Sequence, residues 1–300
     1  MKKRSFKAVL LLFVLTTLTI ALGGCSGDKK GDISSQITIG IPQDLEDSLD
    51  PHKMVTAGTR EVLFNIFEGL VKVTSDGDFV PAVASSYEET EGGKVYTFTL
   101  RDNVKFHDGS TVTAEDVKFS LDKCADTSAG EPLVAAFSNI DSVNILDDKT
   151  VQVVLKEADT EFLAYMTTAI IPASNADPDT NPIGTGPYKF VSRSPQENFV
   201  MERFDDYWGE PAYIKDVTLK ICANADTIVM DLEGGSIDMF ARVTSTQAAE
   251  LSDNFNVLEG TMNLVQALYL NNAEAPFDNE KVRQALCYAI DPQEIMMMVS

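Results

Sequence analysis

The chain has 300 residues, of which 44% are hydrophobic, enough to bury a sizeable core and to form about two domains. Its 46 acidic and 24 basic side chains give a formal net charge of −22 at pH 7. Such a surface repels polyanions, so the composition argues against nucleic acid as a partner. The acidic residues are dispersed, which is typical of a solvated surface and does not identify a cationic ligand.

Residues 1–25 have the pattern of a lipoprotein signal peptide. Four basic residues between positions 2 and 7 precede an uncharged apolar run over residues 8–22. This run is shorter than the about 20 apolar residues of a membrane-spanning helix. The following Leu22-Gly23-Gly24-Cys25 resembles a bacterial lipobox, which makes Cys25 the predicted lipid attachment site. An ordinary signal peptide with a chance cysteine is the alternative.

The next elements are a tether, a strand and a helix. Residues 26–35 are polar and rich in Gly, Ser and Lys, which predicts a flexible tether. Ile37, Ile39 and Ile41 alternate with smaller residues and predict a strand. Residues 42–51 contain the segment Asp47-Ser48-Leu49-Asp50, and the apolar spacing that follows predicts a helix over residues 60–70.

Residues 96–121 read as strand, tight turn and capped helix. Tyr96, Phe98 and Leu100 alternate with polar residues, which predicts a strand with one buried face. The dipeptide Asp108-Gly109 predicts a turn, because glycine tolerates a positive φ. Thr113 lies three residues before Asp116, which is the spacing of a capping box at a helix start. These features are structural and carry no chemistry by themselves.

This stretch resembles the signature of the family 5 extracellular solute-binding proteins, the peptide, nickel and opine receptors of ABC importers. The matching residues are Phe98, Leu100, Arg101, Val104, Phe106, His107, Asp108, Gly109, Thr113, Ala114, Glu115, Asp116, Val117 and Ser120. Further segments are similar to motifs of the same family: residues 183–188, 204–209, 234–238 and 276–291.

Between these motifs the sequence predicts ordinary elements. They are a hairpin over residues 142–156, a short helix over 161–168, a strand over 217–221, a helix from Asp226 to Glu233, a helix capped by Thr244 and Gln247, a strand over 264–270, and a helix capped by Asp278. A phosphate-binding loop at residues 183–188 is disfavoured, because Pro187 removes an amide and neither the glycine pattern nor the lysine position of a P-loop is present.

The resemblance implies an α/β fold of the periplasmic-binding-protein type (type II, class C), whose two lobes close on a ligand around a hinge. On this basis residues 36–66 and 183–270 form the core of lobe I, and residues 67–182 form its subdomain. Residues 271–300 are the start of lobe II. The family members run longer, so we expect a truncated, N-terminal portion. Asp291-Pro292-Gln293-Glu294 supports this, since it begins a helix close to the end of the sequence.

The resemblance also implies a substrate-binding lipoprotein that captures di- or oligopeptides for an ABC permease. The candidate ligand-binding residues are Asp47, Ser48, Leu49 and Asp50, through main-chain contacts, together with Asn271. The protein is then extracytoplasmic, and its N-terminal lipid anchors it to the outer face of the cytoplasmic membrane, or it is periplasmic. The alternatives are a receptor for nickel chelates, opines or oligosaccharides, or a signalling or chaperone lipoprotein without a transport role.

No residue pattern predicts an enzyme, a cofactor or a metal site. The sequence has only two histidines, His52 and His107, and no recognisable nucleophile motif. A transition-metal site needs several His or Cys ligands. We therefore interpret His107 as a hydrogen-bonded structural residue. Cys124, Cys222 and Cys287 are odd in number and far apart, so we expect no structural disulfide.

Overall fold

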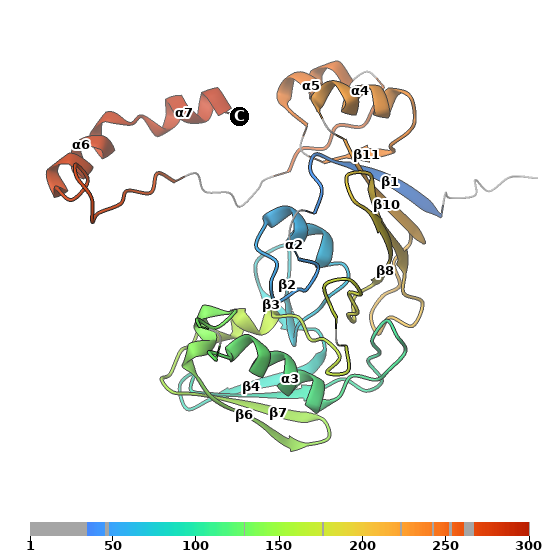
Figure 1. The fold of residues 1–300 in the computed structure, drawn as a ribbon, viewed down its shortest axis with the longest axis vertical. Coiled ribbons are helices and arrows are strands. Elements are labelled where there is room, and N and C mark those ends of the chain that lie inside the picture. Colours follow the sequence, from blue (N-terminus) through green and yellow to red (C-terminus); the bar gives the residue numbers. More distant parts are fainter. Residues whose placement is uncertain are drawn as a thin grey trace, which may run out of the picture.

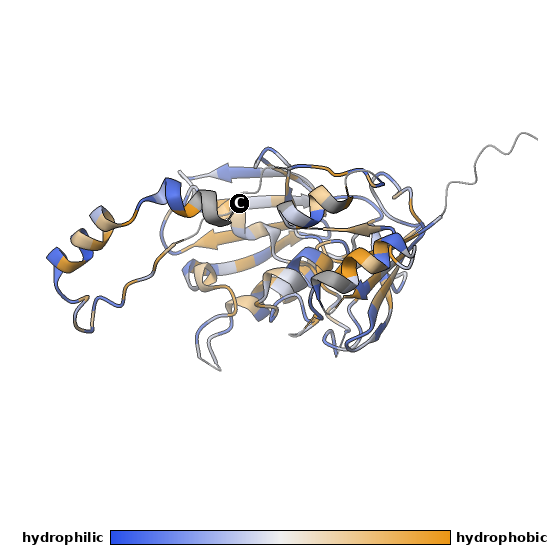
Figure 2. Ribbon diagram, turned by 90° about the horizontal axis from the view of Figure 1, so that it is seen from above, coloured by the Kyte–Doolittle hydropathy of each residue, from blue (hydrophilic) through white to orange (hydrophobic). Residues whose placement is uncertain are grey.

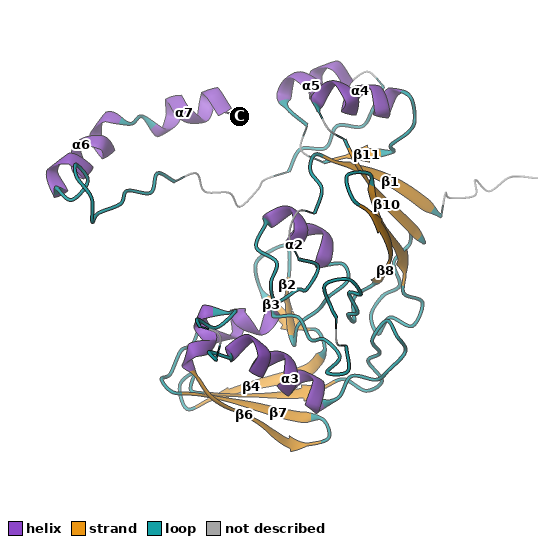
Figure 3. Ribbon diagram, in the orientation of Figure 1, coloured by secondary structure: helices purple, strands orange, loops and turns teal. Residues whose placement is uncertain are grey.

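The structure is a computed structural model that describes residues 35–45, 48–128, 130–175, 177–222, 224–241, 243–251, 254–260 and 267–299. The predicted signal peptide with Cys25, nearly all of the predicted tether and the candidate residue Asp47 lie outside these ranges. Strands in the described residues form three sheets, and helices lie around them (Figure 3). None of the described helices is long and apolar enough to cross a membrane.

A five-stranded mixed sheet joins the first strand to strands nearly 200 residues later. Its order is β11-β1-β10-β9-β8, with β1 parallel to both of its neighbours and β9 antiparallel to β10 and β8. The strands are β1 (Gln36–Ile41), β8 (Tyr188–Ser194), β9 (Asn198–Arg203), β10 (Asp216–Ile221) and β11 (Met239–Phe240). The predicted strands at 37–41 and 217–221 are therefore confirmed.

A four-stranded antiparallel sheet forms the second layer, in the order β4-β5-β7-β6. Its strands are β4 (Ala84–Thr90), β5 (Val95–Leu100), β6 (Ile140–Asp147) and β7 (Thr150–Leu155). Helix α3 (Ala114–Ala125) packs on this sheet, and the two share one hydrophobic core (Figure 1). The predicted hairpin over residues 142–156 is confirmed as β6 and β7. The predicted lobe and subdomain boundaries remain predictions.

The turn and the cap in the signature stretch form as predicted. Gly109 has a φ of +88°, a backbone conformation that residues with a Cβ rarely adopt. Thr113 Oγ1 accepts a hydrogen bond from the Asp116 amide at 3.3 Å, and Asp116 Oδ2 accepts one from the Thr113 amide at 3.0 Å. This reciprocal capping box fixes the start of α3.

The helix predicted over residues 60–70 is wrong in its extent, because α2 covers only Ala57–Leu63. Backbone groups from distant segments occupy the carbonyls that a longer helix would use. Asn65 O accepts from the Tyr188 amide at 3.1 Å, and Ile66 O accepts from the Gly186 amide at 2.9 Å. Gly69 also lies against the backbone of residues 166–167, where a Cβ would be 2.5 Å from Met166 O.

Short elements connect the sheets. They are β2 (Val71–Val73), β3 (Phe79–Pro81) and the 3₁₀ helices η1 (Ala135–Asn139) and η2 (Phe162–Thr167). The short helix predicted over residues 161–168 is thus a 3₁₀ helix. Helix α2 lies between the two larger sheets (Figure 1) and packs with β9 and β10 in a second hydrophobic core.

A third, smaller core surrounds α4 (Ala225–Glu233) and α5 (Ser245–Leu251). The cap of α4 is Asn224, whose Oδ1 accepts from the Thr227 amide at 2.9 Å, so the predicted cap at Asp226 is wrong by two residues. The predicted cap of α5 is confirmed, since the Thr244 amide donates to Gln247 Oε1 at 2.9 Å and Thr244 Oγ1 accepts from the Gln247 amide at 3.3 Å.

Residues 267–299 extend away from the rest of the molecule as an arm with two helices (Figures 1 and 2). These are α6 (Glu280–Ala289), which has no buried residue, and α7 (Pro292–Val299). Asn279 caps α6 in place of the predicted Asp278, whereas Asp291 caps α7 as predicted. In the strand predicted over 264–270, residues 264–266 lie outside the described ranges and 267–270 form no strand.

Candidate ligand-binding site

The segment that holds the candidate residues Ser48, Leu49 and Asp50 is a turn fixed by a carboxylate from a distant loop. Asp179 Oδ1 accepts hydrogen bonds from the Ser48 hydroxyl and from the Leu49 amide, both at 2.8 Å. The Ser48 hydroxyl oxygen in turn accepts from the Asp50 amide at 3.1 Å. The Ser48 and Leu49 hydrogen bonds hold the pKa of Asp179 below its usual value. The turn is thus tied to a loop 130 residues further along the chain.

The buried residue Asp50 stabilises the same turn. Its side chain is 1% exposed and lies 2.8 Å from Lys123 Nζ of α3, with Lys53 Nζ at 3.7 Å. Its carboxylate accepts from the His52 amide at 3.1 Å, and its backbone carbonyl accepts from the amides of Lys53 and Met54. A buried carboxylate needs such ion pairs and hydrogen bonds to offset its loss of hydration. Removing one partner of a buried pair is therefore strongly destabilising.

His52 joins this turn to the segment before the loop that carries Asp179. Its Nε2 lies 2.8 Å from Ala169 O, which fixes Nε2 as the protonated donor, and its Nδ1 lies 3.9 Å from Asp50 Oδ1. Burial lowers the pKa of His52, so the ring is neutral.

The candidate residues differ in how exposed they are. Leu49 and Asp50 are buried with their main chain, at 4% and 1% exposure, whereas Ser48 is half-buried. Asn271 is exposed in the segment that leads to α6, where its Oδ1 accepts from the Ala273 amide at 3.1 Å. In the described residues no hydrogen bond or ion pair joins Asn271 to the turn.

A buried carboxylate that the sequence analysis missed connects two of the family-like motifs. Glu68 is 8% exposed and accepts hydrogen bonds from Tyr207 OH and Trp208 Nε1, both at 2.7 Å, and from Thr185 Oγ1 at 3.3 Å. Burial raises the pKa of Glu68, and the hydrogen bonds from Trp208 and Tyr207 oppose that rise. The sequence contained a signal for such a residue, because Thr185 in one motif and Tyr207 and Trp208 in the other are hydrogen-bond donors that need an acceptor when they are buried.

His107 is a hydrogen-bonded structural residue, as the sequence predicted. Its Nδ1 accepts from the Gly184 amide at 3.2 Å, and its Nε2 lies 3.0 Å from Gly186 O, which fixes Nε2–H as the donor. The signature turn is thereby joined to residues 183–188. Burial lowers the pKa of His107 to about 4, although the Gly186 carbonyl opposes this shift.

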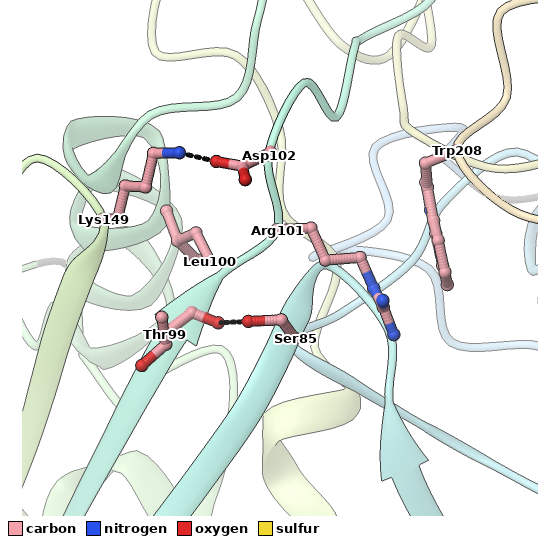
Figure 4. A pocket seen from close by; sticks show the side chains of 7 residues that line it. All are labelled: Ser85, Thr99, Leu100, Arg101, Asp102, Lys149 and Trp208. Atoms are coloured by element: carbon pink, nitrogen blue, oxygen red, sulfur yellow. Dashed lines mark hydrogen bonds and ion pairs between the residues drawn. The ribbon is translucent and has the colours of Figure 1, made fainter.

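A shallow surface pocket of about 540 Å³ lies beside Trp208 (Figure 4). Arg101 points toward Trp208, with its guanidinium carbon 4.3 Å from the centre of the indole ring, and its Nε donates to Ala82 O at 2.6 Å. On the other side of the pocket Lys149 pairs with Asp102. The pocket shares no residue with the turn at 48–54, so it does not belong to the candidate ligand-binding segment. No group of three or more His, Cys, Asp or Glu among the described residues could hold a metal ion.

The motifs joined by Glu68 and His107 are the ones that resemble a single protein family. A family model described as bacterial extracellular solute-binding proteins, family 5 Middle, matches residues 78–300. The chain belongs to this family.

Several relatives of this family 5 protein have names that state a ligand. It is 30% identical to the glutathione-binding protein GsiB of Pectobacterium atrosepticum, over 83% of this chain and 51% of that protein. It is 29% identical to the oligopeptide-binding protein AppA of Bacillus subtilis, over 99% of this chain and 59% of that protein. The structure of NikZ from Campylobacter jejuni in complex with Ni(L-His) matches with a TM-score of 0.74 and 26% identity, over 87% of this chain and 54% of that one.

These comparisons confirm the predicted family and the predicted α/β fold of the periplasmic-binding-protein type. Members of family 5 are substrate-binding proteins and not enzymes. The chain spans about half the length of the curated relatives it matches.

We predict that Glu68→Ala destabilises this family 5 protein by at least about 2 kcal/mol, because Tyr207 OH and Trp208 Nε1 lose their acceptor. Urea denaturation followed by Trp208 fluorescence measures the change. Glu88→Ala is the control, since Glu88 is exposed on β4 and its loss should change the free energy of unfolding by less than about 0.5 kcal/mol. Equal stability of the two variants would show that Glu68 does not hold the motifs together.

We predict that neutral His107 makes the stability depend on pH. Its pKa is lower in the folded protein than the ordinary value of 6.5, so its contribution is complete above pH 6.5 and is lost as the pH falls toward about 4. Between pH 7.5 and 4.5 the wild type should lose on the order of 2 kcal/mol more than His107→Gln, which does not titrate. Denaturant midpoints at the two pH values test this, and parallel losses in both proteins would refute it.

Proposed function

We propose that this protein is the substrate-binding component of an ABC importer and that it captures di- or oligopeptides for transport. The observation that carries the proposal is the family model over residues 78–300, together with similarity to an oligopeptide-binding protein over 99% of this chain. The strongly acidic composition is consistent with a receptor whose ligands are not polyanions.

The proposed ligand-binding segment is the turn that contains Ser48, Leu49 and Asp50, with Asp47 beside it. Extended peptides are held by main-chain hydrogen bonds, which give affinity with little dependence on sequence. Asn271 is proposed as a further contact at the start of lobe II, in residues 271–300. Residues 36–66 and 183–270 are then the core of lobe I, and residues 67–182 its subdomain.

The second candidate is a receptor for a nickel chelate. It is favoured by the similarity to NikZ, which was solved in complex with Ni(L-His). In a chelate the small organic ligand supplies most of the metal-binding atoms, so the receptor needs few metal ligands of its own. A receptor for opines or oligosaccharides would use the same fold, whereas a signalling or chaperone lipoprotein would need no permease.

Uptake measurements in the host cell test the proposed function. Deleting the gene should abolish most of the uptake of radiolabelled trialanine, and a plasmid copy should restore it. Uptake of free alanine is the control, because it should not depend on this receptor. If nickel uptake in the presence of L-histidine fails in the deletion strain while peptide uptake persists, the nickel-chelate receptor replaces the peptide receptor.

We also propose that Cys25 is lipidated and anchors the mature protein to the outer face of the cytoplasmic membrane. The sequence Leu22-Gly23-Gly24-Cys25 after an uncharged apolar run supports this. Growth with a labelled fatty acid should mark the wild type and leave Cys25→Ala unmarked. Cys287→Ala is the control and should be labelled like the wild type. Equal labelling of Cys25→Ala and the wild type would refute lipidation at this position.

A further inference from the structure

The pocket beside Trp208 has an excess of positive charge, although the chain as a whole carries a net charge of −22. Its charged lining residues are Arg101, Lys149 and Asp102, and its hydroxyl-bearing ones are Ser85 and Thr99. The acidic surface of the protein repels anions in general. A pocket in which cations outnumber carboxylates is therefore a place where this surface can attract one.

The indole ring of Trp208 forms a fixed wall of this pocket. Its Nε1 donates to the buried carboxylate of Glu68 at 2.7 Å, which sets the orientation of the ring. The guanidinium carbon of Arg101 lies 4.3 Å from the ring centre, and Lys72 Nζ lies 5.2 Å from it. Cations at such distances from an indole ring are attracted by its π electrons. The Arg101 guanidinium is therefore positioned by the protein before any ligand arrives.

Arg101 keeps one edge of its guanidinium without a protein partner. A guanidinium has five N–H groups. Arg101 Nε donates to Ala82 O at 2.6 Å, and Nη2 donates to Pro81 O at 3.3 Å. Among the described residues no acceptor binds Nη1. The remaining N–H groups belong to Nη1 and Nη2, which together match the two oxygens of a carboxylate or a phosphate.

The other side of the pocket supplies further donors. Figure 4 shows Lys149 and Asp102 paired across the pocket from Trp208. Their side chains are 54% and 75% exposed, so the pair is weak and Lys149 can turn to an entering anion at little cost. Thr99 is exposed on β5, and its hydroxyl has no hydrogen-bond partner in the described part of the chain. Ser85 Oγ, in contrast, already donates to Thr99 O at 3.0 Å.

We propose that this pocket is an anion-binding site that takes the carboxylate or phosphate group of a small molecule, with the free edge of Arg101 as the main contact. Lys149 offsets the charge of Asp102, which would otherwise repel the anion. The site shares no residue with the turn at 48–54 and does not depend on what that turn binds. Because the pocket is shallow, the rest of the bound molecule stays in water, and the affinity is in the millimolar range.

Trp208 is the only tryptophan in the chain, so its fluorescence reports on this pocket directly. Sodium chloride is replaced stepwise by sodium acetate or by sodium phosphate at constant ionic strength and pH 7. The wild-type emission should change and saturate with at least one of the two anions. Saturation with acetate alone would identify a carboxylate site, and saturation with phosphate alone a phosphate site. A titration with sodium chloride alone should cause no saturable change.

Four variants of the full chain test the contacts. Arg101→Gln should weaken anion binding at least about tenfold, because it removes a charged hydrogen-bond donor. Arg101→Lys keeps the charge without the planar edge and should weaken binding about fivefold. Lys149→Gln should weaken it about threefold, since it also leaves Asp102 uncompensated. Lys189→Gln is the matched control and should bind like the wild type, because Lys189 loses an equally exposed pair with Glu202 outside the pocket.

Two results would overturn the proposal. One is a wild-type emission that does not saturate with acetate or phosphate, or that responds equally to sodium chloride. The other is wild-type affinity in a folded Arg101→Gln protein. Arg101→Gln also loses the hydrogen bonds to Ala82 and Pro81, so its thermal midpoint is measured first. If this variant does not fold, Arg101→Lys decides, and wild-type affinity in that variant would show that the edge of Arg101 is not the contact.

Discussion

The buried carboxylate of Glu68 is the constraint on which the arrangement of the sheets depends. Its three donors come from Thr185, Tyr207 and Trp208, which are 117 to 140 residues away in the sequence. The three donors are neutral, and the positive charge of Lys72 also favours the ionised carboxylate. Removing a carboxylate from water costs several kcal/mol unless its lone pairs are satisfied. The hydrogen bonds of the two motifs to Glu68 therefore stabilise the arrangement of the sheets.

Residues 169–171 connect Glu68 to the candidate ligand-binding turn. Ala169 O faces His52 of the turn, the Ile170 amide donates to Glu68 O at 2.9 Å, and the Ile171 amide donates to Ser120 Oγ of α3 at 3.0 Å. Three consecutive residues thus bind the turn, the Glu68 centre and the helix of the signature stretch. A displacement of α3 would reach the turn through this segment and through the Asp50–Lys123 pair.

Structure can be predicted best from the sequence where the interacting residues are close together in the chain. The capping box of Thr113 and Asp116 and the positive φ of Gly109 follow from spacings of three residues or fewer, so local chemistry determines them. The same local reasoning misplaced the cap of α4 by two residues, because Asn224 and Asp226 are equally good cap residues. The end of α2 was wrong because Asn65 and Ile66 bind backbone amides from residues 186–188. Spacing patterns carry no information about such distant partners, and Glu68 and Asp179 were missed for the same reason.

The contributions of Glu68 and Asp179 to stability depend on pH in opposite directions. Burial raises the pKa of Glu68, so its contribution to stability is complete below its unfolded pKa and is lost as the pH rises through the folded one. Hydrogen bonds from Ser48 and Leu49 lower the pKa of Asp179, so its contribution to stability is complete above the ordinary pKa of 3.8 and is lost as the pH falls through the lower pKa of the folded state. Neutral pH therefore favours the fixed turn, whereas burial imposes a desolvation cost on the ionised form of Glu68. The protein tolerates that cost because Tyr207, Trp208 and Thr185 donate to the charged form. The candidate ligand segment is thus joined through residues 169–170 to a carboxylate whose ionised form is disfavoured by burial and favoured by its hydrogen bonds.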